Sequence, residues 1–463
     1  MKKIITSCFY FCLVSFNYLS AQLDPNLETM FQNSLVQHYA LGFDGISAAV
    51  RTSDGFLASA AGISALYEHL TTASTFGMGS VTKTIISATF LHMAEDGLLD
   101  LDNPLGDYLP DIEFVDPAIT IRQLLNHTSG IYDIAQNPNF WDDVFANQQA
   151  IISPWELLEN YLSTPNFPAG MEWAYSNTNY IVLGLIIEAI SDTSYYAEAR
   201  ARFDFDVNYP SFSVPPYESA TEDMAHLWMD TTFSNGPLVD IHASGWSLDA
   251  LFSAAGAAEA YASNPSDLAT WAYDLFSGAL LESGSMDALL EIVPPSTRWG
   301  LGVEFEQTSC GQERVGHVGS IYYTTATFYD PENDIAVSVH CNSQSNYISL
   351  VTSLASTLIC NYEEFLMSTS TEDAPRTHNF RVYPNPASNF LNISWSGNQN
   401  KQAPDEIVIS DLYGRIVFMQ QLANENLSNQ VMINLNELQS GSYVLIFRND
   451  GQLITFNRFI VMK

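Results

Sequence analysis

The charged side chains divide this chain of 463 residues into two parts of different character. Residues 22–370 contain 7 basic and 44 acidic side chains, a net charge of −37, whereas residues 371–463 contain 7 and 8, a net charge of −1. A shift of this size indicates two domains, and the polar, proline-bearing stretch at 367–379 is typical of a linker. We therefore expect a large acidic domain at 22–366 and a small domain at 380–463.

Composition narrows the class of protein further. Hydrophobic residues make up 47% of the chain, which is enough for a large buried core in a chain longer than one ordinary domain of about 100–200 residues. The acidic surface repels phosphate backbones and anionic membranes. We therefore expect no nucleic-acid partner.

The first 21 residues have the three parts of a secretory signal peptide. Lys2 and Lys3 form a basic start, residues 4–14 an apolar stretch, and Leu19-Ser20-Ala21 a cleavage site of small residues. The apolar stretch is too short for a permanent transmembrane helix, and no later segment is long and apolar enough for one. We expect an exported protein without an integral membrane segment.

Three cysteines remain after cleavage of such a peptide, namely Cys310, Cys341 and Cys360. An exported protein reaches a compartment that permits disulfides. One intramolecular pair is therefore possible, with one thiol left over, and the spacing does not choose among the three pairings.

Strand patterns at both ends of the acidic domain enclose a helical middle part. Alternating apolar residues predict strands near residues 46–52, 56–62, 299–307, 313–320, 324–330 and 335–341. Helical periodicity predicts helices near 24–40, 80–96, 178–191 and 347–366. We expect an α/β (α+β) fold in which strands from both ends of the acidic domain close one antiparallel sheet. Helices flank this sheet, and an all-helical lobe joins it. Short alternating runs in the small domain, such as 407–410 and 443–447, predict an all-β sandwich.

Lys83 is the single lysine of the acidic domain, and it follows Ser80 by three residues at the start of a predicted helix. Residues at this spacing share a helix face, so the amine can reach the hydroxyl. A serine alcohol needs a nearby base to act as a nucleophile, and partial burial would lower the pKa of the lysine enough for it to serve. The alternative is a capped helix with a surface lysine, because Ser-x-x-Lys alone is a weak motif.

Two further segments contain candidate active-site residues. Tyr175-Ser176-Asn177 places a phenol and an amide two residues apart before an apolar helix, where Asn177 could also be a simple helix cap. His317-Val318-Gly319-Ser320 lies on a predicted strand, in which Gly319 would let another backbone approach closely. The alternative there is an ordinary strand with a buried histidine.

Together these segments resemble the motifs of the serine-active penicillin-recognising hydrolases. The most similar subgroup holds class C β-lactamases, D-alanyl-D-alanine carboxypeptidases of that type and related esterases. The resemblance covers about residues 22–365 and includes Phe76 to Lys83, Leu124 to Gly130, Tyr175 to Asn177 and His317 to Gly319. Within the second of these segments, His127 is expected to hold a turn rather than to act in catalysis.

The resemblance implies a role for each residue. Ser80 would be the acylated nucleophile, and Lys83 either its base or the cation that holds Tyr175 as a phenolate. Tyr175 would pass the proton to the leaving group, and Asn177 would bind the acyl-side amide of the substrate. The backbone N–H groups of Ser80 and Ser320 would form the oxyanion hole. No cofactor or metal ion is implied, and the sequence assigns no water activator for deacylation beyond Tyr175 and Lys83.

His317 stands where true β-lactamases of this group usually carry lysine. A lysine offers a permanent charge to a substrate carboxylate, whereas a neutral histidine offers one hydrogen bond. Arg314, nearby in sequence, could partly compensate. We expect His317, Gly319 and Ser320 to bind a small-molecule or peptide substrate in an esterase or D-amino-acid peptidase. A β-lactamase and a catalytically silent protein that binds or senses cell-wall peptides are the alternatives.

The small domain resembles the C-terminal sorting domain that the type IX secretion system reads. The resemblance lies in Tyr383-Pro-Asn-Pro386, Asp411-Leu-Tyr-Gly-Arg415 and Leu438-Gln-Ser-Gly-Ser-Tyr443. It implies the type IX machinery as a partner and passage across the outer membrane of a Gram-negative bacterium of the Bacteroidetes kind. A carbohydrate-binding β-sandwich is the alternative.

Overall fold

The computed structural model describes residues 24–218, 224–231, 236–343 and 347–369, and in the C-terminal part 379–383, 389–396, 404, 406–411, 416–422, 430–436, 438–439, 441–449 and 452–461. The chain separates into two compact units between Met367 and Ser368. The predicted signal peptide and most of the predicted linker lie outside the described residues. Within the described part, no helix has the length and apolar character needed to cross a membrane.

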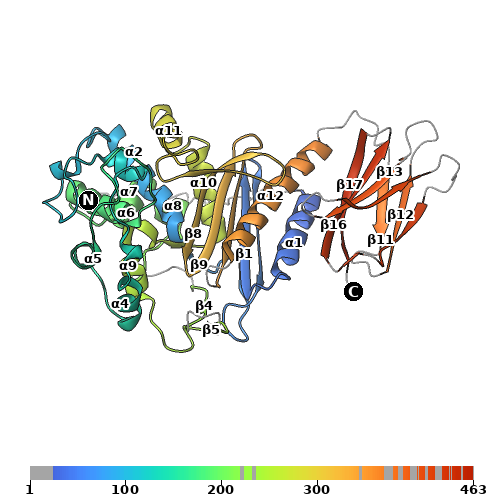
Figure 1. Cartoon of the computed structure of the whole chain (residues 1–463), viewed down its shortest axis with the longest axis horizontal. Helices are drawn as coiled ribbons and strands as arrows, with labels where there is room; N and C mark the ends of the chain where they lie inside the picture. The colour runs from blue at the N-terminus through green and yellow to red at the C-terminus, as the bar shows by residue number, and fades with distance from the viewer. Residues whose placement is uncertain are drawn as a thin grey trace, which may run out of the picture. The chain divides into compact units, whose positions relative to one another are not determined.

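A six-stranded antiparallel sheet forms the centre of the first unit, in the order β2-β1-β10-β9-β8-β7 (Figure 1). Its strands are β1 (Gly45–Thr52), β2 (Gly55–Gly62), β7 (Glu304–Gln307), β8 (Glu313–Ile321), β9 (Tyr323–Asp330) and β10 (Ile335–Cys341). Thr52 lies opposite Ile335, so the first hairpin pairs with the last strand of the unit. The two ends of the acidic domain therefore close one sheet, as predicted.

The predicted strand at 299–307 is wrong in its first half, because β7 begins only at Glu304. Gly302 adopts a positive φ of 70°, and a Cβ atom there would lie 2.3 Å from both Ser87 Oγ and Tyr180 Oη. The chain bends at this glycine to pass close to the helical lobe, so it cannot continue as a strand.

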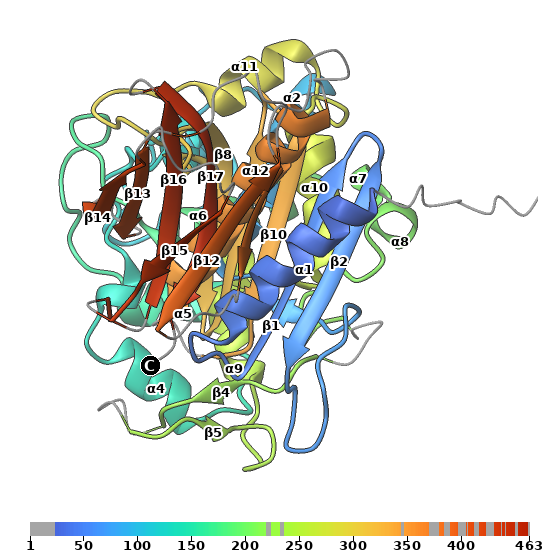
Figure 2. The same ribbon diagram turned by 90° about the vertical axis from the view of Figure 1, so that its right-hand side faces the viewer.

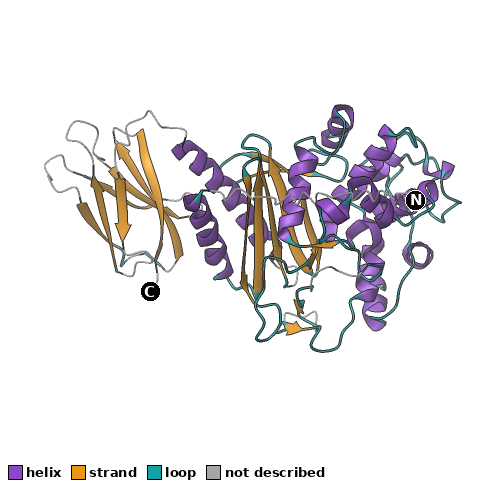
Figure 3. Cartoon of the chain, turned by 180° about the vertical axis from the view of Figure 1, so that it is seen from behind, coloured by secondary structure: helices purple, strands orange, loops and turns teal. Residues whose placement is uncertain are grey.

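Helices cover both faces of the sheet (Figure 3). On one face lie α1 (Pro25–Tyr39), which runs along β1 and β2 (Figure 2), and α12 (Ile348–Thr369). They share an apolar core with the sheet that includes Leu35, Val337 and Ile359. A disulfide joins Cys310 to Cys360 of α12, and Cys341 is buried with a free thiol.

On the other face, α10 (Pro265–Phe276) packs on β1, β9 and β10, and the helical lobe lies beyond β8. α6 (Asn177–Ser191) runs through the centre of the lobe and is buried from Thr178 to Ile187, which explains why its sequence is apolar on all sides. The remaining helices are α2 (Thr82–Glu95), α3 (Ile121–Leu125), α4 (Phe140–Ala146), α5 (Pro154–Tyr161), α7 (Tyr195–Phe203), α8 (Phe205–Asn208), α9 (Asp249–Glu259) and α11 (Ser283–Leu290). Short strand pairs are formed by β3 (Phe76–Gly77) with β6 (Ala262–Ser263), and by β4 (Trp228–Met229) with β5 (Val239–Asp240).

The second unit contains two antiparallel sheets, ordered β11-β12-β15 and β14-β13-β16-β17. Residues of both sheets, among them Ile393 and Phe447, form one buried apolar cluster, so the sheets pack face to face as a sandwich. The strands are β11 (Asn379–Tyr383), β12 (Phe390–Ser396), β13 (Glu406–Asp411), β14 (Ile416–Gln421), β15 (Gln430–Asn434), β16 (Gly441–Asn449) and β17 (Gln452–Val461). The motif positions 384–388 and 412–415 lie outside the described residues.

Candidate active site

Ser80 lies in a short 3₁₀ turn, Gly79–Val81, that leads directly into α2. The turn packs against β8 so closely that a Cβ atom at Gly79 would lie 2.4 Å from the backbone nitrogen of Ser320. A Cβ atom at Gly319 would lie 3.1 Å from the backbone nitrogen of Ser80. Two glycines thus allow the backbone amides of Ser80 and Ser320 to lie near each other.

The amine of Lys83 is buried one helical turn after Ser80. Its Nζ lies 3.1 Å from Ser80 Oγ, 2.8 Å from Asn177 Oδ1 and 3.0 Å from the carbonyl oxygen of Ala258. An ammonium group carries three hydrogens, and these three acceptors engage all of them. The spacing of Ser80 and Lys83 in the sequence therefore translates into direct contact.

The surroundings of Lys83 favour the neutral amine more than water does. Burial lowers the pKa of its amine from 10.5 to about 8, although the carboxylates of Glu259 and Asp133 oppose the shift. A neutral amine, which has a lone pair to accept a proton, is therefore accessible at this position.

Tyr175 comes from the loop before α6 and lies over the same amine. The Lys83 Nζ atom is 4.9 Å from the centre of the Tyr175 ring, which stacks on His127 at 4.4 Å between ring centres. Loss of water around the phenol raises its pKa well above 10, and the charge of Glu259 adds to the effect, while a hydrogen bond with Ser80 opposes it. Tyr175 is therefore a protonated phenol within reach of the Ser80 hydroxyl.

His127 packs against the loop that carries Tyr175. It is fully buried with a positive φ of 63°, and its Nδ1 accepts a hydrogen bond from the backbone nitrogen of Ser176 at 3.2 Å. This contact fixes the segment that carries Tyr175 and Asn177, so His127 has a structural role in a segment other than its own turn.

Asn177 is the first residue of α6, and both ends of its amide are engaged. Its oxygen accepts from Lys83, and its nitrogen lies 3.5 Å from Oδ2 of Asp133. Asp133 is buried and also accepts from the backbone nitrogen of Ala135 at 3.1 Å. Asp133 therefore orients Asn177, which in turn orients Lys83.

His317 faces the site from β8 as a neutral imidazole. Its Nδ1 donates to the carbonyl oxygen of Val318, so its buried Nε2 is an acceptor, and that atom has no hydrogen-bond partner among the described residues. Burial, together with the charge of Lys83, lowers the pKa of His317 to about 3. The ring lies 5.3 Å from that of Trp299 and 6.2 Å from that of Tyr175, measured between centres.

The expectation that Arg314 compensates for the missing lysine is wrong. Arg314 precedes His317 by three residues on the same strand, and an odd separation places two side chains on opposite faces of a sheet. Its guanidinium group donates to Glu306 at 2.8 Å and lies 4.0 Å from the centre of the Phe328 ring. The site therefore receives no positive charge from Arg314.

Glu259, the last residue of α9, is a site residue that sequence reasoning missed. Ser80 Oγ donates a hydrogen bond to its Oε1 at 2.8 Å. Burial raises the pKa of this carboxyl group, and the charge of Lys83 opposes the shift. The one available signal was an acid within the stretch Ala254–Ala260, which otherwise holds only alanine and glycine.

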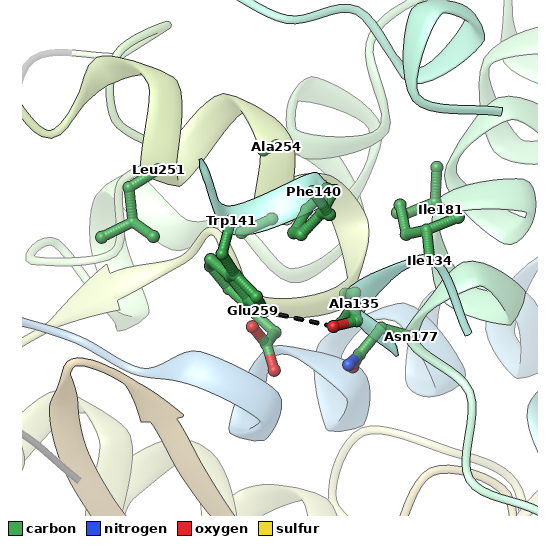
Figure 4. Close-up of a pocket in the computed structure, with 11 residues that line it drawn as sticks. Ile134, Ala135, Phe140, Trp141, Asn177, Ile181, Leu251, Ala254 and Glu259 are labelled. Atoms are coloured by element: carbon green, nitrogen blue, oxygen red, sulfur yellow. Dashed lines mark hydrogen bonds between the residues drawn. The ribbon is translucent and has the colours of Figure 1, made fainter. Parts of the chain in front are cut away.

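An apolar pocket opens beside Glu259 and Asn177 (Figure 4). Its wall includes the indole of Trp141, whose Nε1 donates to the carbonyl oxygen of Ala135 at 3.2 Å. Apart from the two polar side chains, the pocket is lined by Ile134, Ala135, Phe140, Trp141, Ile181, Leu251, Ala254, Ala255 and Ala258. The apolar walls with two polar side chains at their edge have the character of a ligand site.

A match to a sequence-family model that covers more than half of the chain identifies its family. The beta-lactamase family model matches residues 32–349. The chain belongs to the beta-lactamase family. A second model, the secretion system C-terminal sorting domain, matches residues 381–462, so the C-terminal unit belongs to that family of sorting domains.

Curated relatives match parts of the beta-lactamase-family domain. Penicillin-binding protein 4* of Bacillus subtilis (strain 168) is 30% identical over 175 residues, which are 37% of this chain and 37% of that protein. Esterase EstB of Burkholderia gladioli is 28% identical over 190 residues, which are 38% of this chain and 47% of that protein. The chain spans less than half the length of these relatives.

Solved structures match a larger share of the chain than these relatives do. A D-stereospecific amidohydrolase from Streptomyces sp. is 26% identical, with a TM-score of 0.62, and the match covers 71% of this chain and 98% of that one. The D-amino acid amidase of Ochrobactrum anthropi SV3, complexed with L-phenylalanine amide, is 23% identical with a TM-score of 0.63 over 73% and 99% of the two chains. The second likeness concerns the fold alone.

Proposed function

We propose that this chain is a secreted serine hydrolase that cleaves an ester or amide bond through an acyl-enzyme on Ser80. The observation that carries the proposal is the 3.1 Å contact between Ser80 Oγ and the buried amine of Lys83, next to the paired backbone amides of Ser80 and Ser320. Nucleophile, base and oxyanion donors meet at one point, as acyl transfer requires.

Lys83 acts as the base that takes the proton of Ser80. When the amine is neutral, its two hydrogens satisfy Asn177 and the carbonyl of Ala258, and its lone pair faces Ser80 Oγ. The hydroxyl hydrogen, which is donated to Glu259 in the structure, turns to this lone pair when Ser80 is activated. A pKa of about 8 keeps a useful fraction of the amine neutral at neutral pH. The alternative, in which Lys83 stabilises a Tyr175 phenolate, is disfavoured because the pKa of that phenol is raised well above 10.

Tyr175 passes a proton to the leaving group as a neutral phenol. It interacts with the Ser80 hydroxyl and lies over Lys83, so a proton that Lys83 has taken can be relayed outward. The backbone amides of Ser80 and Ser320 stabilise the tetrahedral intermediate. Loss of one such donor typically costs about 2.7–4 kcal/mol of transition-state stabilisation.

An ester, or an amide of a D-amino acid, is the substrate class that the site supports best. Neutral His317 cannot pair with a substrate carboxylate as lysine would, and Arg314 points away. The likeness to a D-stereospecific amidohydrolase and to an esterase supports this ranking over a β-lactamase. The apolar pocket beside Asn177 would receive the acyl side of the substrate.

A comparison of wild type with Ser80→Ala tests the proposal. Both proteins are exposed to a fluorescent phosphonate and to fluorescent penicillin, and turnover is measured with p-nitrophenyl acetate, a D-amino-acid amide, a D-Ala-D-Ala peptide and nitrocefin. We expect a Ser80-dependent adduct and hydrolysis of the ester or the D-amino-acid amide. Absence of any Ser80-dependent adduct would instead indicate a silent binding protein.

The C-terminal unit acts as a sorting signal in this proposal. A signal peptide at 1–21 would bring the chain to the periplasm, and the domain at 380–463, behind a linker at 367–379, would direct the hydrolase of 22–366 through the type IX machinery. The match to the secretion system C-terminal sorting domain supports this route to the cell surface or medium.

A further inference from the structure

Glu259 contacts the nucleophile directly, and the acylation steps described above give it no role. Its Oε1 accepts the hydrogen of Ser80 Oγ at 2.8 Å. We propose that Glu259 is the base of deacylation, which activates the water that hydrolyses the acyl-enzyme on Ser80. This inference rests on the proposed function and assigns the step for which the sequence offers no separate residue.

Acylation removes the hydrogen that Glu259 binds. Once Ser80 Oγ carries an acyl group it is an ester oxygen without a proton, so Glu259 Oε1 loses its donor. A buried carboxylate without a donor is costly, and a water molecule that donates to it restores the lost hydrogen bond. Because Oε1 lies 2.8 Å from the atom that carries the acyl group, such a water lies next to the ester carbon.

The other polar groups of the site are poor bases at this stage. The raised pKa of Tyr175 keeps it a phenol, and burial lowers the pKa of His317 to about 3. Asp133 is turned toward Ala135 and Asn177. Lys83, which has returned its proton through Tyr175, keeps its two hydrogens on Asn177 and Ala258, and its lone pair points at Ser80 Oγ, the ester oxygen, rather than toward an incoming water. Glu259 is left as the carboxylate nearest to the ester.

The main chain around Glu259 holds its carboxylate in place. Gly256, with a φ of 47° and a ψ of −143°, breaks the regular course of α9 just before its end. The following turn directs the carbonyl of Ala258 to Lys83 and the side chain of Glu259 to Ser80. Glu259 also lines the apolar pocket (Figure 4), where few other polar groups compete for a bound water.

Deacylation consumes one water molecule and restores the Ser80 hydroxyl. Glu259 takes one proton from the water while the water oxygen forms a bond to the acyl carbon, and the carbonyl oxygen becomes an oxyanion held by the two backbone amides. The intermediate then collapses, and the bond between the acyl carbon and Ser80 Oγ breaks. Glu259 returns its proton to Ser80 Oγ, which restores the hydroxyl and releases the carboxylic acid.

The experiment compares wild type, Glu259→Gln and Glu188→Gln with p-nitrophenyl acetate in a stopped-flow instrument. Glutamine keeps the size and the hydrogen-bonding oxygen of residue 259 but cannot take a proton. Glu188 is a matched control, because it is a half-buried carboxylate at the other end of α6 whose oxygen accepts from the backbone of Tyr195. Thermal melting of all three proteins verifies that they fold.

We expect Glu259→Gln to release one equivalent of p-nitrophenol in a burst and then to turn over about 100-fold or more slowly than wild type, as for loss of a general base. Intact-mass measurement should find one acetyl group on the variant, attached to Ser80. In wild type the steady-state rate should fall at low pH, where Glu259 becomes protonated and can no longer act as a base. This fall should be absent in Glu259→Gln. Glu188→Gln should behave as wild type does.

Three results would overturn the role of Glu259. The first is turnover of Glu259→Gln at the wild-type rate. The second is loss of burst and steady state together without an acetyl adduct, which would place Glu259 in acylation. A raised KM with unchanged kcat would likewise contradict it and indicate substrate binding. If wild type itself gave no Ser80-dependent burst, the proposed function would fail, and this role would fail with it.

Discussion

A Cβ atom at Gly319 would lie 1.9 Å from the carbonyl oxygen of Met78. This contact fixes the distance between β8 and the turn that carries Ser80, and backbone atoms on both sides leave no flexible group to move aside. The proposed oxyanion hole therefore depends on the absence of a side chain at Gly319.

We expect Gly319→Ala to lower kcat by about 100-fold or more, because separating the two backbone amides removes an oxyanion donor. The measurement is steady-state hydrolysis of p-nitrophenyl acetate at equal protein concentrations. Gly284→Ala is the control, since Gly284 lies on the exposed side of α11 with no atom within 4 Å of an added Cβ. Equal activity of Gly319→Ala and wild type would contradict the assigned oxyanion hole.

The acylation rate should rise with pH up to about 8. Lys83 is active as the neutral amine, its pKa is lowered to about 8, and the ammonium form below that pH has all three hydrogens engaged. The second-order rate of labelling by a phosphonate, followed from pH 5.5 to 9.5, reports this step alone. Lys83→Arg, which stays charged, should label at least about 100-fold more slowly at every pH. A flat profile in wild type would show that Lys83 is not the base.

His317→Lys should raise turnover of substrates that carry a carboxylate. The neutral imidazole offers an acceptor nitrogen, whereas an ammonium group would form a charge-assisted bond, and bonds of that kind contribute about 1.5–3 kcal/mol. We therefore expect a gain of about 10-fold or more in kcat/KM for nitrocefin. Neutral p-nitrophenyl acetate serves as the reference substrate. If the ratio of kcat/KM for nitrocefin to that for p-nitrophenyl acetate stayed the same or fell, the interpretation of His317 would be wrong.

Deletion of residues 378–463 should leave an active hydrolase in the periplasm. The cut falls after α12, so it removes no strand of the catalytic sheet. Cell fractionation with activity measurement locates the enzyme in the full-length and truncated strains. Normal release of the truncated form into the medium would refute the role of the C-terminal unit as a sorting signal.

The sequence predicted those parts of the site that depend on local geometry. Ser80 and Lys83 meet because three residues make one helical turn, and His317 and Gly319 share a face because they are two apart on a strand. The same rule, had it been applied to Arg314, would have excluded it. The closing of one sheet by strands from both ends of the domain also follows from the alternating patterns there, whereas the pairing of β1 with β10 came only from the structure.

Contacts between distant segments were not predictable in the same way. Glu259 is separated from Ser80 by 179 residues. The direction of its side chain depends on the break in α9 at Gly256, which the alanine-rich sequence does not predict. The start of β7 was misplaced because the bend at Gly302 depends on the proximity of Ser87 and Tyr180, which come from other helices. The cysteine pairing could not be predicted for the same reason, because three pairings fit the spacing equally well.

The pairing of Thr52 with Ile335 limits the order in which the first unit can fold. The first hairpin emerges early from the ribosome or the translocon, yet its partner strand is almost three hundred residues behind it. Non-local pairing of this kind forms late and slowly. Ser80, whose turn packs against β8 of the same sheet, therefore reaches its final position only after nearly all of residues 22–366 have been synthesised. The proposed hydrolase would become active only at that point.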